Sequence, residues 1–142
     1  MMINKLTEDV SVAPQITVDD IPAIAAAGFR TIICNRPDGE EFAQVACGEI
    51  EAAAKAHGIT FSHQPVGSGQ ITLEDVTDFK ALLNASEKPL LAYCRSGTRC
   101  AVLWAFSQAG NTPTEAIVKT AQNAGYDLSG LASALAAAAE QQ

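Results

Sequence analysis

Several features that mark other protein classes are missing from this 142-residue sequence. No apolar run approaches the ~18 residues that a membrane-spanning helix needs, so we expect no membrane partner. The opening "MMINKLTEDV" lacks the basic and then apolar order of a signal peptide. A formal net charge of −7 argues against the basic face on which nucleic-acid binding depends. We therefore expect a cytoplasmic protein with no nucleic-acid partner.

Paired metal-ligating cysteines are missing as well. The four cysteines are Cys34, Cys47, Cys94 and Cys100, and no two of them have C-x-x-C spacing. With only two histidines, the sequence also lacks zinc-finger spacing. A reducing cytoplasm disfavours structural disulfides, so we expect four free thiols. The ordinary role of such a thiol is that of a small buried apolar side chain.

What the sequence does contain is an alternation of short apolar strands with capped helices. The pattern predicts strands over 10–16, 31–34, 59–66 and 89–93. It predicts helices over 21–28, 40–57, 73–84, 101–110, 112–125 and 128–140. Strands separated by helices imply right-handed crossovers and a mostly parallel sheet. We expect one domain, residues 1–142, with a three-layer α/β/α fold and a central sheet of four to five strands.

Three loops should meet at one edge of this sheet. In open parallel sheets, ligands bind beyond the carboxyl ends of the strands. The segments at those ends are "NRPDGEE" after the second predicted strand, "GSGQ" after the third and "CRSGTRC" after the fourth. The site should lie where these three segments converge.

The segment "CRSGTRC" has the composition of an anion-binding loop. Cys94 ends a buried strand and a helix follows within a few residues, so backbone N–H groups and the helix dipole should point at one place. Gly97 gives the backbone freedom for that curl, and the Arg99 fork can hold two oxygens of an anion. The same donors should lower the pKa of Cys94 and make it a nucleophile. We predict Cys94 and Arg99 as catalytic, and the rest of the loop as anion-binding: Arg95, Ser96, Gly97, Thr98 and Cys100.

The two arginines have no acidic neighbour in the sequence. From Pro89 to Thr114 there is no Asp or Glu, which favours arginines that await an anion. The alternative is that Arg95 and Arg99 pair with distant acids and that Cys94 is only a buried thiol.

The loop and the surrounding chain resemble two different families. "CRSGTR" resembles the C-x-x-G-x-R loop of rhodanese-type sulfurtransferases. Three longer stretches, "ITVDDIPAIAAAGFRTIICNRPDGEE", "HQPVGSGQIT" and "LLAYCRSGTRCAVLWA", resemble the phosphatase-like domain of the beta-lactamase hydrolase-like proteins, over residues 3–125. This resemblance implies a cysteine-phosphatase-like fold, related to the dual-specificity phosphatases. Some members carry a metallo-β-lactamase-like domain, which implies association with a persulfide dioxygenase-type enzyme.

Two departures from the cysteine-phosphatase pattern predict a sulfurtransferase. C-x5-R would place the arginine at position 100, where this sequence has Cys100, so the loop looks one residue shorter. No Asp or Glu occurs over 62–72, where the dual-specificity pattern has its general acid. Sulfite or a thiolate leaves without a proton, so we predict a persulfide on Cys94 and a small anionic sulfur substrate.

Two other functions remain open. The first is a cysteine-dependent phosphatase that acts on a small phosphate substrate through a phosphocysteine on Cys94. The second is a non-catalytic module that binds anions or responds to sulfide. None of these functions calls for a cofactor or a metal.

Three residues near the site, Asp38, Arg36 and Cys100, each allow two interpretations, and Asn35 is a candidate neighbour of the pocket. Asp38 could act as an acid from the "NRPDGEE" loop, or could simply form the Pro-Asp-Gly turn. Asn35 and Arg36 begin the same loop; Arg36 adds a positive charge over the pocket or pairs with Glu40 or Glu41. Cys100 either resolves an oxidised Cys94 or packs in the core.

Overall fold

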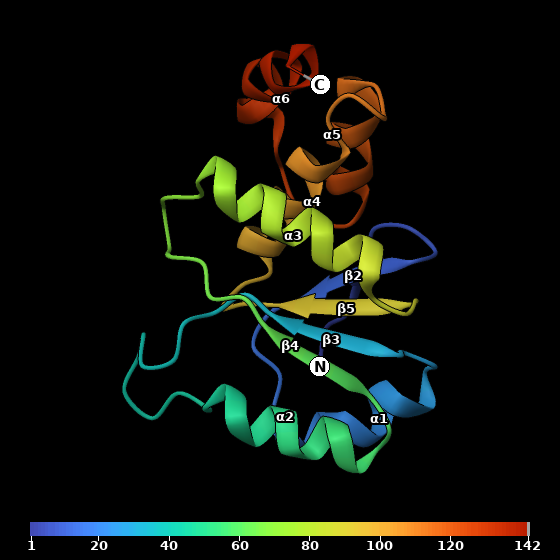
Figure 1. Cartoon of the computed structure of the whole chain (residues 1–142), viewed down its shortest axis with the longest axis vertical. Coiled ribbons are helices and arrows are strands. Elements are labelled where there is room, and N and C mark those ends of the chain that lie inside the picture. The colour runs from blue at the N-terminus through green and yellow to red at the C-terminus, as the bar shows by residue number, and fades with distance from the viewer. Residues whose placement is uncertain (142) are drawn as a thin grey trace.

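The computed structural model describes residues 1–141 and contains one five-stranded sheet between layers of helices (Figure 1). In spatial order the strands are β1 (Asn4–Lys5), β2 (Val10–Ala13), β5 (Leu90–Tyr93), β3 (Thr31–Cys34) and β4 (Thr60–His63). All neighbouring strands are parallel except β1, which runs antiparallel to β2. The predicted three-layer α/β/α fold with a mostly parallel sheet is confirmed.

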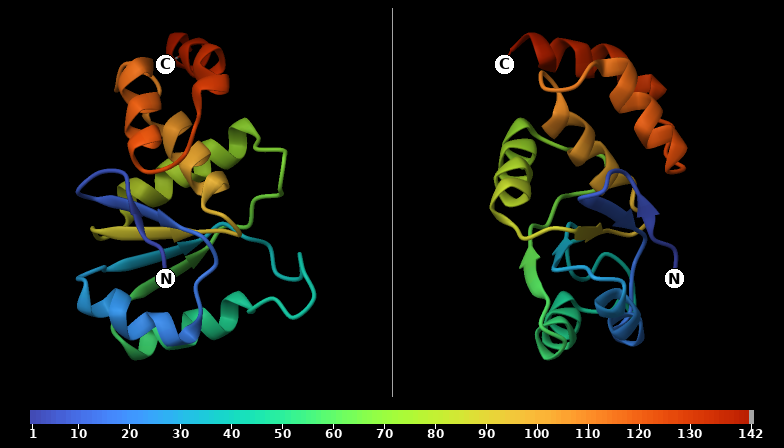
Figure 2. Two further views of the ribbon diagram at one scale, coloured as in Figure 1. Left: turned by 180° about the vertical axis from the view of Figure 1, so that it is seen from behind. Right: turned by 90° about the vertical axis from the view of Figure 1, so that its right-hand side faces the viewer.

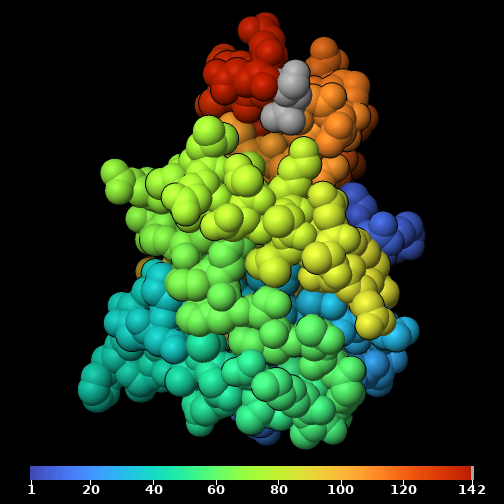
Figure 3. All heavy atoms as spheres, viewed as in Figure 1, coloured from blue at the N-terminus to red at the C-terminus, as the bar shows by residue number. Residues whose placement is uncertain are grey.

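The helices form the two outer layers (Figure 2). One layer holds α1 (Ile21–Ala26) and α2 (Cys47–Ala56), and the other holds α3 (Leu73–Ala85) and α4 (Thr98–Gln108). Beyond α4 lie α5 (Thr114–Asn123) and α6 (Ala132–Glu140), and the short 3-10 turns η1 (Val18–Asp20) and η2 (Ser129–Leu131) precede α1 and α6. Figure 3 shows the face formed by α2, β4 and α3. Within residues 1–141, no helix combines the length and the apolar character needed to cross a membrane.

The central strand β5 divides the core into two parts. Because side chains alternate across a strand, Leu90 and Ala92 face α3 and α4, while Leu91 and Tyr93 face α1 and α2. Every residue of β5 is buried, as a parallel strand covered on both faces requires. Cys94 continues the even-numbered set and therefore points to the α4 side. The alternation of β5 thus decides on which face of the sheet the predicted nucleophile lies.

The helix-start signals in the sequence are confirmed at two places. The carboxylate of Asp20 accepts a hydrogen bond from the Thr17 N–H at 2.8 Å, just before α1. At α3, Thr72 Oγ1 accepts from the Asp75 N–H at 3.1 Å and the Asp75 carboxylate accepts from the Thr72 N–H at 2.9 Å. These reciprocal bonds satisfy N–H groups that have no partner within the helix.

The predicted helix over 40–57 is wrong in its first half, because α2 begins only at Cys47. Side chains of the preceding segment bond backbone groups that a helix would use. Gln44 Oε1 accepts from the N–H groups of Glu40 at 3.0 Å and Glu41 at 3.2 Å. Ala43 has a φ of 62°, which a helix excludes. Residues 38–46 are therefore a loop held by its own side chains.

The N-terminal edge of the sheet also differs from the prediction. The strand predicted over 10–16 ends at Ala13, and β1 was not predicted at all. A strand of two residues is too short to show the alternation by which strands are recognised in a sequence.

The core on the α4 side gives a direct test of this fold. Leu103 in α4 is fully buried in the same cluster as Ile33, Phe79 and Leu90. We expect Leu103→Ala to lower the free energy of unfolding by about 2–5 kcal/mol, because the lost methyl groups leave a cavity. Urea denaturation followed by circular dichroism measures this change.

The matched control is Leu73→Ala, since the Leu73 side chain on α3 is 77% exposed. This change should shift the free energy of unfolding by about 0.5 kcal/mol or less. Equal effects of the two substitutions would contradict the assignment of Leu103 to the core.

Candidate active site

The three loops expected to meet at the carboxyl edge of the sheet do so. Glu40 and Glu41 from the loop after β3, Ser68 from the loop after β4, and Arg95 and Arg99 after β5 surround a small cavity of about 220 Å³. The same loops are joined by a hydrogen bond from Arg99 Nη1 to the carbonyl oxygen of Val66, at 2.9 Å. The candidate site is therefore assembled from segments more than 50 residues apart in the chain.

The sulfur of Cys94 lies under the N-terminus of α4. The Gly97 N–H donates to Sγ at 3.1 Å, and the N–H groups of Arg99 and Cys100 also help to lower the pKa of this thiol. The Cys100 thiol and these amides outweigh burial and lower the pKa of Cys94 to about 6. Cys94 is consequently a thiolate near neutral pH, although its side chain is fully buried.

Gly97 sets the path of the loop above this sulfur. Its φ of 91° is a left-handed conformation that favours glycine. A Cβ at this position would collide with the hydroxyl of Tyr126 and lie 3.3 Å from the backbone carbon of Ala13. Tyr126 in turn donates to the carbonyl oxygen of Ser96 at 3.2 Å. The loop is thus fixed from outside by a residue that the sequence did not single out.

Cys100 packs in the core, which was one of the two roles considered for it, and it lies beside Cys94. It is fully buried in the α4 core, as the packing interpretation expects. Its thiol also reaches the sulfur of Cys94, and donates to Asn35 Oδ1 at 3.2 Å. Burial raises the pKa of Cys100 well above its usual value, so it stays a neutral donor. Both thiols are free; the single proton of the Cys100 thiol goes to Asn35 Oδ1 in this structure, and the same thiol beside Cys94 favours the ionised form of that sulfur.

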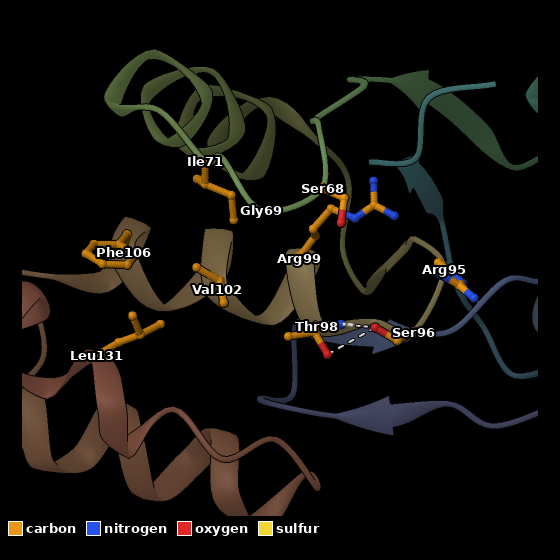
Figure 4. Close-up of a pocket in the computed structure, with 10 residues that line it drawn as sticks. All are labelled: Ser68, Gly69, Ile71, Arg95, Ser96, Thr98, Arg99, Val102, Phe106 and Leu131. Carbon is orange, nitrogen blue, oxygen red and sulfur yellow. Dashed lines mark hydrogen bonds between the residues drawn. The ribbon is translucent and has the colours of Figure 1, made fainter. Parts of the chain in front are cut away.

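The expectation of unpaired arginines is wrong for both residues. Arg99 Nη1 lies 2.8 Å from Glu40 Oε2 and Nη2 lies 2.9 Å from Oε1, a two-pronged pair. Arg95 is exposed and its Nε lies 2.6 Å from Glu41 Oε1. Both acids come from the loop after β3, more than 50 residues away in sequence. The absence of Asp and Glu close to the arginines in the sequence therefore did not mean that they lack acidic partners. In Figure 4 the Arg99 side chain extends from the start of α4 toward Ser68.

Glu40 is the site residue whose importance the sequence did not reveal. Besides Arg99 it accepts a hydrogen bond from Arg36 Nε at 2.9 Å, so one carboxylate joins two buried guanidinium groups. The hydrogen bonds from Arg99, with smaller effects of Arg36, lower the pKa of Glu40. Its only signal in the sequence was a pair of adjacent acids in a loop predicted to face the site. Arg36 therefore pairs with Glu40, which was one of the two interpretations considered.

Asp38 and Asn35 have structural partners. The Asp38 carboxylate accepts from the Cys47 N–H at 2.8 Å at the start of α2, and this bond lowers the pKa of Asp38. Asp38 thus lies in a turn and caps a helix, in line with the turn interpretation. Asn35 is fully buried and donates from Nδ2 to the carbonyl oxygen of Gln64 at 3.1 Å. This hydrogen bond joins the residues that directly follow β3 and β4.

The lowered pKa of Cys94 can be measured directly. We expect the thiolate absorbance of the protein, minus that of Cys94→Ser, to titrate with a midpoint near pH 6. Cys100→Ala should raise this midpoint, because it removes the thiol that contributes most to stabilising the charge.

Cys47→Ala is the matched control, since the pKa of Cys47 is raised to about 11, first by burial and then by Asp38. That substitution should leave the midpoint near pH 6 unchanged. Since the folded pKa of Cys94 lies below its unfolded value, stability should also rise with pH between about 6 and 9, and fall as pH drops through 6. A midpoint near 9 would contradict the geometry described above.

The family and the solved structures that this chain resembles are of the phosphatase type. The model of the family "Beta-lactamase hydrolase-like protein, phosphatase-like domain" matches residues 2–111. The crystal structure of a candidate phosphatase from Neisseria meningitidis Z2491 is 43% identical, with a TM-score of 0.88 over 97% of this chain and 99% of that one. A candidate phosphatase from Shewanella putrefaciens CN-32, 17% identical, shares the fold with a TM-score of 0.75 over 95% and 88% of the two chains.

The sulfurtransferase prediction is therefore wrong, because the matching family and the solved relative at 43% identity are of the phosphatase type. Both arguments for a sulfurtransferase, the spacing from Cys94 to Arg99 and the missing acid over 62–72, used only short stretches of sequence. Arg99 lies in the first turn of α4, and its guanidinium is held by Glu40. The missing acid over 62–72 does not exclude a phosphatase, because a leaving group that forms a stable anion needs no proton from the protein.

Two curated relatives are much longer than the part that aligns with this chain. The beta-lactamase hydrolase-like proteins of Agrobacterium fabrum (strain C58 / ATCC 33970) and Xylella fastidiosa (strain Temecula1 / ATCC 700964) are each 32% identical to it, over 126 and 130 residues. The alignments cover 87% and 90% of this chain but only 29% and 30% of those proteins. The chain belongs to the family of phosphatase-like domains of the beta-lactamase hydrolase-like proteins.

Proposed function

We propose that this chain is a cysteine-dependent phosphatase that hydrolyses phosphate monoesters, with Cys94 as the nucleophile. The observation that carries the proposal is the sulfur of Cys94 held ionised by N–H groups at the start of α4. The thiolate attacks phosphorus, the ester P–O bond breaks, and the leaving oxygen takes a proton from water. A second water then attacks the phosphocysteine, which releases inorganic phosphate and restores the thiolate.

Arg99 is proposed to bind the phosphoryl oxygens. Its fork now holds the two oxygens of Glu40, and a phosphoryl group presents a similar pair of oxygens. Because Cys94 is covered, the proposal requires the loop or the Glu40 side chain to move when a phosphate monoester binds. Ser96 and Thr98, whose hydroxyl groups bond one another at 3.0 Å, would line the entrance.

The leaving group should need little help from an acid. The lowered pKa values of Asp38 and Glu40 keep both carboxylates ionised near neutral pH, so neither holds a proton to donate. We propose that phenols, which leave as stable anions, are released faster than alkyl alcohols. The expected persulfide dioxygenase-type partner came from the domain that some family members carry; no comparison supports it, so it is not part of this proposal. A cytoplasmic location stays a prediction.

Phenyl phosphate hydrolysis tests the proposal. We expect release of phosphate, and a loss of activity of about a thousandfold or more in Cys94→Ser, because the hydroxyl is a far weaker nucleophile. Intact mass spectrometry after rapid acid quenching should show one added phosphoryl group on the active protein and none on the variant.

Cys47→Ser serves as the control, since this thiol bonds Asp38 and His63 instead of the α4 amides. It should retain activity within about threefold. Full activity in Cys94→Ser, or no phosphate release by the unaltered protein, would overturn the proposed function.

A further inference from the structure

A hollow beside the site has one polar and one apolar end. A cavity of about 610 Å³ opens beside the loop, within the range of about 300–1,000 Å³ typical of small-molecule sites. Ser96, Thr98 and Arg99 line its polar end. The apolar end, visible in Figure 4, is formed by Ile71, Val102, Phe106 and Leu131. One hollow thus joins the proposed phosphoryl-binding loop to a carbon-lined wall.

Helix α4 supplies the floor of this cavity. Thr98, Val102 and Phe106 are spaced by four residues, so they lie along one face of the helix, beginning at the anion-binding loop. The opposite side of α4 is buried against the sheet and α3, whereas Val102 and Phe106 remain partly open. These apolar side chains therefore lead away from Cys94 along the surface.

The apolar wall continues beyond the first cavity. A second hollow of about 250 Å³ shares Ile71 and Phe106 with it and adds Leu73, Val76 and Ala138. Leu73 is 77% exposed although it is a large apolar residue. We call the two hollows together the apolar groove, lined by Ile71, Leu73, Val76, Val102, Phe106 and Leu131.

We propose that the apolar groove binds the apolar group of a phosphate monoester whose phosphoryl group lies on the loop. This inference rests on the proposed phosphatase function and narrows its substrates to aryl phosphates with an apolar extension. The groove continues directly from the loop, so one molecule can occupy both. Between Thr98 and the far end, where Thr72 and Gln141 lie, its walls are mainly aliphatic and aromatic carbon. Such walls give no hydrogen bonds to the hydroxyl groups of sugar or nucleoside phosphates, which should be poor substrates.

A series of para-alkyl phenyl phosphates tests the groove with almost constant leaving-group chemistry. The compounds are phenyl phosphate and its para-methyl, ethyl, propyl and butyl derivatives. We expect kcat/KM to rise up to about fourfold for each methylene that becomes buried. Glucose phosphate and adenosine monophosphate should be hydrolysed with much lower kcat/KM than para-butylphenyl phosphate. A flat series, with clear hydrolysis of phenyl phosphate, would overturn the inference and leave the phosphatase function standing.

Two substitutions test whether the rise of kcat/KM with alkyl length arises in the apolar groove. Val102→Asn should reduce the dependence of kcat/KM on alkyl length, because a polar amide in the wall opposes the burial of each added methylene. Phe106→Ala should do the same, by removing part of the wall. Val118→Asn is the matched control, because Val118 is also a partly buried helical valine, but on α5 beside a different hollow. An equal loss in Val118→Asn would assign the effect to general destabilisation and contradict the groove.

Binding measurements keep the two proposals separate if turnover is absent. Calorimetry should give a lower Kd for para-butylphenyl phosphonate than for phenyl phosphonate, and Val102→Asn should remove the difference. That result without hydrolysis of any ester would support the groove and overturn the phosphatase. Equal Kd values for the two phosphonates would overturn the groove.

Discussion

The site depends on the hydrogen bonds between the first turn of α4 and the sulfur of Cys94. Burial alone would keep this thiol protonated, because a charge is costly where little water reaches it. The N–H groups of Gly97, Arg99 and Cys100, together with the Cys100 thiol, reverse that effect and lower the pKa to about 6. The geometry exists because β5 ends one residue earlier and Gly97 turns the chain directly into the helix. The Cys100 thiol and the backbone N–H groups at this one connection therefore together keep the sulfur of Cys94 ionised.

A second set of interactions holds the loops around that sulfur. Glu40 joins Arg36 and Arg99, and Arg99 also bonds the carbonyl oxygen of Val66, so the loops after β3, β4 and β5 share one charged network. Pairing with Glu40 raises the already high pKa of Arg99 further, and the guanidinium remains charged. The bidentate geometry fixes the plane of the Arg99 fork. Glu40 thus holds the Arg99 guanidinium near the Cys94 thiolate, and the N–H groups at the start of α4 remain directed at the sulfur.

The alternation of elements was predictable because it depends on local patterns. The four buried residues of β5, the capping pair of Thr72 and Asp75, and the glycine that starts α4 each follow from a few adjacent residues. The helix predicted over 40–57 failed for the opposite reason. Its first half has a helical composition, but Gln44 and Asp38 bond backbone groups there, and Glu40 is drawn to arginines in other segments. Contacts between distant segments outweigh a weak helix propensity.

The sequence by itself determined the α/β/α architecture, the position of Cys94 at the end of a buried strand, and the donor-rich loop around it. It could not determine the partners of Arg95 and Arg99, because Glu41 and Glu40 approach them only when the sheet brings three loops to one edge. Nor could it show that Ile71 and Leu131 flank the exposed face of α4. Strand ends and helix caps arise from neighbouring residues. Ion pairs and pocket walls join residues far apart in the chain, and only the tertiary structure fixes those distances.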